Sequence, residues 1–188
     1  WMISTFLFSQ PYMYNNANFP NLFTGIRAKR YFGKIGIRIS YERMLNKSSS
    51  EYNTDTLSYT QENFLSENAF RIGIEYKKTH HDVLALHFFA DYLLNYFKGD
   101  YKNYDPYSQM IWDEKTNGIC QGAVLGVGFD WIISDNFSLG LETRLDFLSY
   151  SQNFEVINHQ KGFSVKYHDT ANDLNLKLLG NFTLNYHF

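Results

Sequence analysis

The carboxy-terminal stretch, residues 174–188, constrains the fold more than any other part of the sequence. Counted back in twos from the end, one set of its residues is apolar apart from a single glycine: Phe188, Tyr186, Leu184, Phe182, Gly180, Leu178, Leu176 and Leu174. The residues between them are mostly polar. Successive side chains of a strand point to opposite faces, so the pattern predicts a strand with one apolar face and one polar face. Its length suits a tilted strand across a bilayer, which needs about 9–11 residues.

Composition limits the class of protein. The 188 residues are enough for a single barrel or sandwich domain, which we place over residues 1–188. The formal net charge of -2 gives no basic field that would favour nucleic acid. The single cysteine, Cys120, excludes an internal disulfide and a cysteine-rich zinc site. The sequence contains no run of about 18 apolar residues, so no membrane-spanning helix is predicted. A membrane protein is still possible, because a closed barrel also satisfies its backbone hydrogen bonds in lipid.

Further segments alternate with the same two-residue period, at 22–31, 35–45, 70–77, 83–96, 117–132 and 137–150. Short turns are predicted between them at 32–34, 78–82 and 134–136. Longer polar stretches at 11–21, 46–66, 97–116 and 151–173 are predicted as loops. Within the last stretch, Phe163, Val165 and Tyr167 alternate with polar residues, so part of it is expected to form a hairpin above the rim of the sheet.

The repeated order of strand, short turn, strand and long loop predicts an up-and-down meander. Seven strands are clear, and a sheet closed by antiparallel neighbours needs an even number, of which eight is the smallest that side chains can fill. Residues 1–10 therefore have two interpretations: a first strand, or the end of a secretory signal peptide. Parity favours the strand.

Alternation alone does not say which face is inside, because a soluble lipocalin-like carrier has its apolar face inward. Three features favour a membrane barrel with the apolar face outward. Glycines gather on the polar face, where a narrow barrel is crowded: Gly25, Gly36, Gly73, Gly122, Gly126, Gly128 and Gly140. Positive and negative charges on that face are nearly equal in number, as a packed interior requires. Aromatic residues gather near the strand ends, as in interfacial girdles.

The closing residues Leu184, Asn185, Tyr186, His187 and Phe188, with the aromatic girdles and the alternation of short turns and long loops, resemble small outer-membrane β-barrels of Gram-negative bacteria. The composition, rich in Asn, Tyr, Phe and Lys, resembles such proteins from Bacteroidota. The resemblance implies a closed antiparallel up-and-down transmembrane β-barrel of about eight strands, a signal peptide, periplasmic turns and extracellular loops. It also implies outer-membrane lipid as surroundings, and recognition of Phe188 and the last strand by the barrel-assembly machinery.

Candidate interior and loop sites follow from the same pattern. An ion-paired network is expected to plug the lumen, at Arg38, Arg71, Glu75, Asp130, Glu142, Arg144 and Asp146. The alternative for these residues is a narrow, porin-like ion path. Loop aromatics are candidates for binding a glycan or protein, at Tyr101, Tyr104, Tyr107 and Trp112, and the alternative is packing of the loop on itself.

Histidines supply the remaining candidate chemistry. His80, His81 and Asp82 fall in a short turn without further ligands nearby in sequence, so we interpret them as a polar turn and expect no metal or cofactor. His159 and His168, with Ser164 and Glu155, would be available to a surface lipid- or peptide-acting enzyme, but their spacing is not diagnostic. We therefore expect a non-enzymatic protein with a structural or surface-interaction role and an unidentified extracellular partner.

Overall fold

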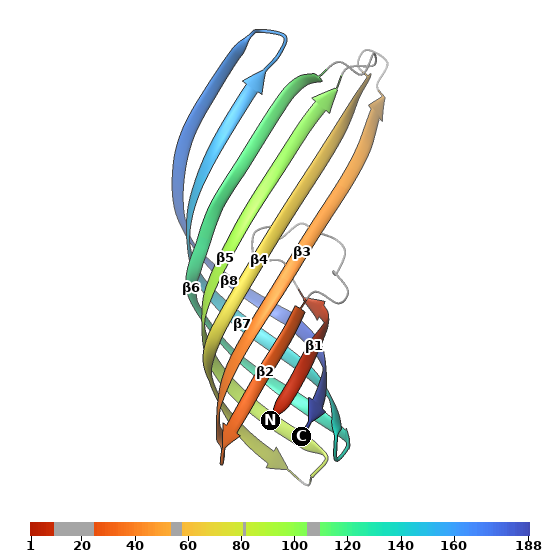
Figure 1. Ribbon diagram of the computed structural model, residues 1–188, viewed down its shortest axis with the longest axis vertical. Coiled ribbons are helices and arrows are strands. Elements are labelled where there is room, and N and C mark those ends of the chain that lie inside the picture. The colour runs from red at the N-terminus through yellow and green to blue at the C-terminus, as the bar shows by residue number, and fades with distance from the viewer. Residues whose placement is uncertain (10–24, 54–57, 81, 105–109) are drawn as a thin grey trace.

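The computed structural model describes residues 1–9, 25–53, 58–80, 82–104 and 110–188. They form a closed barrel in which each antiparallel strand pairs with its neighbours in sequence and β1 pairs with β8 (Figure 1). The strands are β1 Met2–Ser9, β2 Gly25–Phe32, β3 Ile35–Asn53, β4 Ser58–His80, β5 Leu84–Tyr104, β6 Met110–Ser134, β7 Phe137–Asn158 and β8 Phe163–His187. The predicted up-and-down barrel is confirmed, and residues 2–9 form its first strand. The predicted loop at 11–21 lies outside the described residues.

Short turns and both termini lie at one end of the barrel (Figure 1). Gly33 follows β2 with a φ of 67°, a conformation that glycine adopts without steric cost. The backbone N–H of Phe188 donates to the carbonyl of Trp1 over 3.0 Å, which holds the last residue beside the first. The described part of the chain contains no helix long and apolar enough to cross a membrane.

Three of the stretches predicted as loops are largely strand, so the predicted ranges 46–66, 97–116 and 151–173 are wrong. Pairing between β3 and β4 continues without a shift to Asn53 and Ser58, and pairing between β7 and β8 continues to Asn158 and Phe163. The alternation there is weaker because both faces carry polar residues, which hides a strand in the sequence. The hairpin predicted around Phe163, Val165 and Tyr167 is present.

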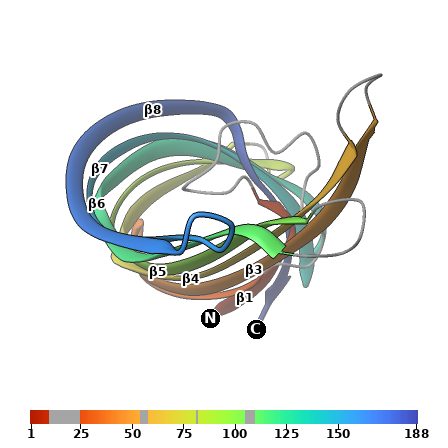
Figure 2. The ribbon, with the colours of Figure 1, turned by 90° about the horizontal axis from the view of Figure 1, so that it is seen from above.

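The wall is therefore of unequal height. β1 and β2 have 8 residues each, whereas β4, β6 and β8 have 23 to 25 (Figure 1). We use "extension" for the part of β3–β8 that rises beyond the barrel: residues 44–53, 58–67, 97–104, 110–118 and 152–169. Viewed from above, the strands curve around a common interior (Figure 2).

Bulky apolar side chains cover the outside of the barrel below the extension. Ile39 and Ile72, neighbours on β3 and β4, are 55% and 56% exposed. Aromatic side chains border this belt on the side of the short turns, at Trp1, Phe32, Tyr76, Trp131, Phe137, Tyr186 and Phe188. On the other side lie Tyr41, Phe70, Tyr92, Tyr96 and Phe147. The outer surface is thus an apolar belt between two aromatic rims.

Candidate functional site

The lower interior of the barrel holds charged side chains from β2 to β8. All seven residues predicted for the lumen are buried with at most 3% exposure. Each lies on the face opposite the apolar belt because strand side chains alternate, so that Arg38 points inward between exposed Ile37 and Ile39. Arg27, Lys29, Glu42, Asp91 and Lys177 join them.

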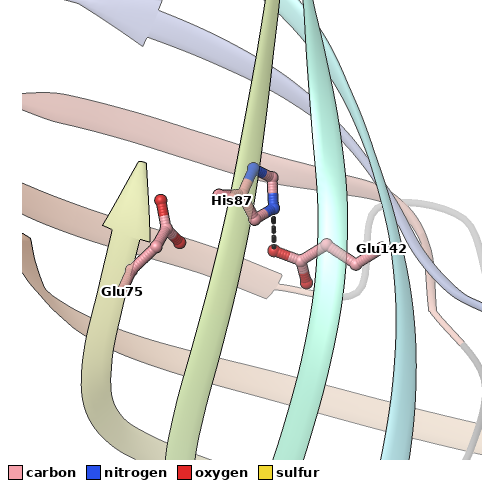
Figure 3. Close-up of side chains that lie close together, drawn as sticks. All are labelled: Glu75, His87 and Glu142. Carbon is pink, nitrogen blue, oxygen red and sulfur yellow. Dashed lines mark ion pairs between the residues drawn. The ribbon is translucent and has the colours of Figure 1, made fainter. Parts of the chain in front are cut away.

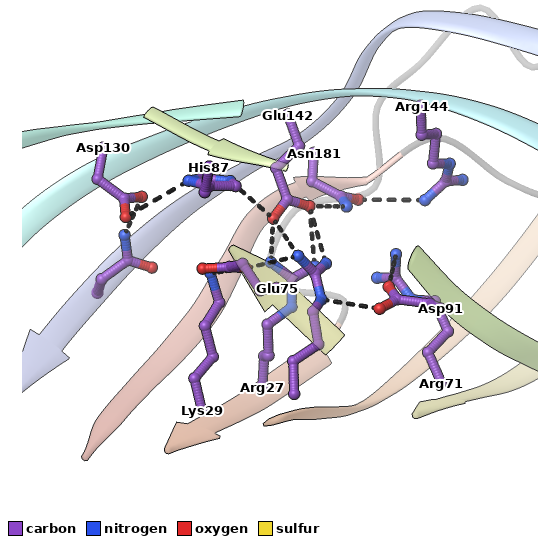
Figure 4. Close-up of polar contacts among 12 residues, drawn as sticks. Arg27, Lys29, Arg71, Glu75, His87, Asp91, Asp130, Glu142, Arg144 and Asn181 are labelled. Atoms are coloured by element: carbon purple, nitrogen blue, oxygen red, sulfur yellow. Dashed lines mark hydrogen bonds and ion pairs between the residues drawn. The ribbon is translucent and has the colours of Figure 1, made fainter. Parts of the chain in front are cut away.

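Glu142 on β7 lies at the centre of this network (Figure 4). Its two carboxylate oxygens accept hydrogen bonds from Arg27 Nη1 and Nη2 over 2.5 and 3.0 Å. Arg38 Nη1 lies 3.3 Å from Glu142 Oε1, and Asn181 Nδ2 donates to Glu142 Oε2 over 2.8 Å. A carboxylate held by a two-pronged guanidinium contact is geometrically fixed as well as neutralised.

Glu75 on β4 forms a second centre, linked to the first through Arg38. Arg38 Nη1 and Lys29 Nζ each lie 2.8 Å from Glu75 Oε2, and the Tyr31 hydroxyl donates to Glu75 Oε1. Arg38 Nε also lies 3.0 Å from Asp91 Oδ1, and its guanidinium stacks 3.9 Å from the centre of the Phe89 ring. One arginine thus contacts carboxylates from three different strands.

Smaller groups of ion pairs flank these centres. Arg71 contacts Glu42, and Asp146 lies 3.3 Å from Arg144 Nε and 3.5 Å from Lys177 Nζ. Asp130, near the short turns, lies 3.8 Å from Lys77 Nζ and accepts a hydrogen bond from Asn185 Nδ2 over 2.9 Å. Charges of opposite sign alternate through the interior, which limits the cost of burying them.

Glu75, His87 and Glu142 bring one ligand atom each within 4.8 Å of one another, a separation that a metal ion could bridge (Figure 3). Both carboxylates are already held by Arg27, Lys29 and Arg38, so a divalent cation would meet three positive charges. His87 Nε2 lies 3.5 Å from Glu142 and Nδ1 lies 3.7 Å from Asp130. We therefore assign the group to the ion network.

Above the ion network the interior is largely apolar, which the sequence interpretation missed. Glu67 and Asn95 are also buried there, and Asn95 Nδ2 donates to Glu67 over 3.2 Å. Ala69, Phe89, Leu93, Phe97, Cys120, Val124, Leu148 and Tyr150 form one buried cluster inside the barrel. The expectation of a polar interior holds for the lower part only. The sequence interpretation placed His87, Asp91 and Asn95 on the inner face of β5, but it did not include Phe89, Leu93 and Phe97, which alternate with them on that face.

Glycines on β6 accommodate the large residues of this cluster. In the register of β5 and β6, Phe89 lies opposite Gly126, Leu93 opposite Gly122 and Phe97 opposite Gly118. Large residues four apart on one strand therefore meet glycines four apart on the next. This matching of large and small is visible in the sequence and would have identified the apolar members of the inner face of β5.

Substitution of Gly128 tests how closely the interior is packed. A β-carbon at Gly128 would collide with the His87 ring and the Leu141 carbonyl oxygen. Gly128→Ala should lower the free energy of unfolding by about 1–3 kcal/mol, measured by urea unfolding in lipid vesicles. The matched control is Gly99→Ala, because a β-carbon there meets nothing closer than 3.8 Å. Equal stability of both variants would show that neighbouring groups can move to accommodate the β-carbon at Gly128 without loss of stability.

The predicted aromatic binding residues lie on strands of the extension, and they do not form one patch. Tyr101 and Trp112 share the inner face. Tyr101 lies four residues after buried Phe97 on β5 and therefore points to the same side. Trp112 on β6 pairs with Asn103, two residues further along β5 on that side. Tyr104 lies on the outer face, and its hydroxyl donates to Glu62 over 3.4 Å. Partial burial, followed by the charge of Glu62, raises the pKa of this phenol. Tyr107 lies outside the described residues.

The polarity of the two faces is reversed in the extension. Outside, the lysines of the strands gather with exposed polar residues: Lys47, Lys98, Lys102, Lys115 and Lys166. Inside lie apolar and aromatic residues: Leu65, Tyr101, Trp112, Phe154, Val156, Phe163, Val165 and Tyr167. The rings of Phe154 and Tyr167 stack with centres 4.6 Å apart. A polar outer face of this kind suits contact with water and not with lipid.

The outer face also holds the residues considered for catalysis. His168 Nδ1 lies 2.9 Å from Asn153 Oδ1, and the carboxylate of Glu155 pairs with Lys166 Nζ over 2.9 Å. His159 is exposed in the turn after β7. Lys166, Glu155 and His168 border a hollow of ≈ 620 Å³. Nearby, Lys115 Nζ donates to Asp113 Oδ2 over 3.1 Å, and this contact raises the pKa of Lys115. Among the residues considered for catalysis, Glu155 is thus ion-paired at the surface and His168 is hydrogen-bonded to an amide.

Solved structures that match this chain include an outer membrane protein. A major outer membrane protein from Thermus thermophilus matches with a TM-score of 0.56 and 12% identity, over 100% of this chain and 97% of that one. The ferric yersiniabactin uptake receptor FyuA from Yersinia pestis has a TM-score of 0.46 and 9% identity; the match covers 80% of this chain and 23% of that one. No protein-family model and no curated protein matches the sequence.

The topology and the first of these similarities define the class of fold: a closed, all-antiparallel, up-and-down β-barrel of the kind found in bacterial outer membranes. At these identities the similarity concerns the fold alone.

Proposed function

We propose that the chain is a non-enzymatic barrel of the Gram-negative outer membrane, with a structural or surface-interaction role carried by its extension. The observation that supports this most directly is the pairing of an apolar outer belt with a buried ion-paired interior. In water the belt would expose many contiguous large apolar side chains, which soluble monomers avoid. In a bilayer the same belt faces acyl chains.

The proposed orientation puts the short turns and termini in the periplasm and the extension outside the cell. Cysteine labelling in intact cells tests it. Ser49→Cys, on the exposed outer face of the extension, should react with an impermeant maleimide, and Asn136→Cys, in the turn before β7, should react only after permeabilisation. The reverse pattern would invert the orientation, and recovery of the protein in the soluble fraction without detergent would refute a membrane location.

We further propose that the ion network plugs the lumen. An eight-stranded barrel is filled by its own side chains, and here Arg27, Arg38, Arg144 and Phe6 are buried in it. The purified protein should therefore show negligible conductance in planar bilayers. A steady open-pore current carried by the wild-type chain would instead support the channel alternative.

The last strand is proposed as the assembly signal. Phe188 directly follows β8 and lies beside Trp1, with its ring centre 4.7 Å from that of Tyr186. Deletion of Phe188 should reduce the amount of folded protein in the outer membrane several-fold while leaving refolding into lipid vesicles intact. Equal loss in both assays would assign Phe188 a stabilising role instead of a role in recognition.

A further inference from the structure

The inner face of the extension combines exposed aromatic groups with charge of a single sign. In the residues that the structure describes, every lysine of the extension strands lies on the outer face, and no arginine or lysine lies on the inner one. The charged residues of the inner face are the carboxylates Glu67, Glu114 and Asp169. An aromatic surface with only negative charge is complementary to organic cations.

Glu114 lies in the middle of the aromatic region. Tyr101 and Val156 are its direct neighbours across β5 and β7. Trp112 lies two residues away on the same strand and is 39% exposed. Phe154, diagonally adjacent on β7, stacks on Tyr167, which is 49% exposed. A cation near Glu114 would therefore meet a carboxylate and several ring faces at once.

Gly99 leaves space beside this group. It lies opposite Thr116 on the inner face, next to Tyr101, and a β-carbon there would have no atom closer than 3.8 Å. At glycines of the lower interior, such as Gly126, an added β-carbon would instead collide with a neighbouring side chain, there the Phe89 ring. The floor below Gly99 is closed by Phe97, buried to 5% exposure. The inner face at Gly99 is thus open above an apolar floor.

We propose that this face binds an organic cation with an aromatic or alkyl body, with the charge beside Glu114 and the body between Tyr101, Phe154 and the apolar floor at Phe97. Carboxylate and ring faces together select positive charge, and the apolar surroundings select bodies that leave water readily. This inference rests on the proposed location of the extension outside the bilayer, where a dissolved cation reaches it.

Titration of the protein in phosphatidylcholine nanodiscs tests the proposal, with benzyltrimethylammonium as the probe and benzenesulfonate as the anionic comparison. Calorimetry should show saturable binding of the cation and no binding of the anion. Glu114→Gln should weaken cation binding about fivefold, corresponding to the roughly 1 kcal/mol of a charge contact at a partly exposed site. Gly99→Phe, which fills the open space, should abolish binding.

Glu155→Gln is the matched control, because it removes a carboxylate from the outer face of the neighbouring strand; it should leave the affinity unchanged. Heat-modifiable gel mobility verifies that each variant is folded. Equal binding of benzenesulfonate, absence of cation binding, or unchanged binding in both Glu114→Gln and Gly99→Phe would refute the inference. If the protein still fractionates with the outer membrane, such a result refutes the cation site alone and leaves the proposed function intact. Recovery of the protein in the soluble fraction would refute the proposed function itself.

Discussion

Replacing Glu142 by glutamine should lower the free energy of unfolding by about 3–5 kcal/mol, because it leaves buried Arg27 and Arg38 without their shared counter-charge. Glutamine keeps the size of the side chain, so the loss reports charge and not packing. The Asn181 amide loses its charged acceptor as well. Urea titration of the protein refolded in lipid vesicles measures the change.

Glu155→Gln provides the comparison. Its carboxylate pairs with Lys166 over 2.9 Å, but the lysine side chain is 73% exposed, so solvent already screens the interaction. Its loss should change the unfolding free energy by less than about 1 kcal/mol. If the two substitutions cost the same, water must reach Glu142, and the interior would be hydrated instead of plugged.

The outer face of the barrel was predictable because apolar residues recur along its outward positions, as contact with lipid would require. Ile35, Ile37 and Ile39 are all apolar, and all are exposed in the structure. A soluble sheet would tolerate polar residues at some of these positions. Single polar residues such as Thr143 interrupt the apolar series, but the period of two stays clear in the belt, and strand number and closure follow from it.

The strand ends were not predictable by the same argument, because outward positions beyond the belt are no longer regularly apolar. Where polar residues occupy both faces of the sheet, backbone pairing continues while the side-chain pattern relaxes, as at Ser48, Ser49 and Ser50 on β3. A polar run of this kind has the composition of a loop. The reversed polarity around Phe154 and Tyr167 gave only a short alternation, so the sequence indicated one hairpin there and not a six-stranded extension.

The candidate interior site was predicted in its charges but not in its apolar part. Arg38, Glu75 and Glu142 stand out because a charge between apolar residues has only one face on which to lie. Phe89, Leu93 and Phe97 do not, since they alternate on the inner face with polar His87, Asp91 and Asn95 while the outer face of the strand is apolar as well. Pairing with β6, which sets glycines against them, shows how these large side chains fit inside.

The second large effect expected concerns the belt itself. Ile72→Arg places a charge on the outer face between Ile39 and Tyr92, 56% exposed in the isolated chain. If acyl chains surround this position, the substitution should cost about 2–4 kcal/mol in vesicles. Ser49→Arg, on the outer face of the extension, should change stability by less than about 0.5 kcal/mol, as is usual for surface substitutions. If the barrel were soluble, Ile72→Arg should not be the more damaging substitution, because arginine would then replace an exposed apolar group in water and improve solubility. Equal stability of Ile72→Arg and Ser49→Arg would therefore show that the apolar belt does not face a bilayer.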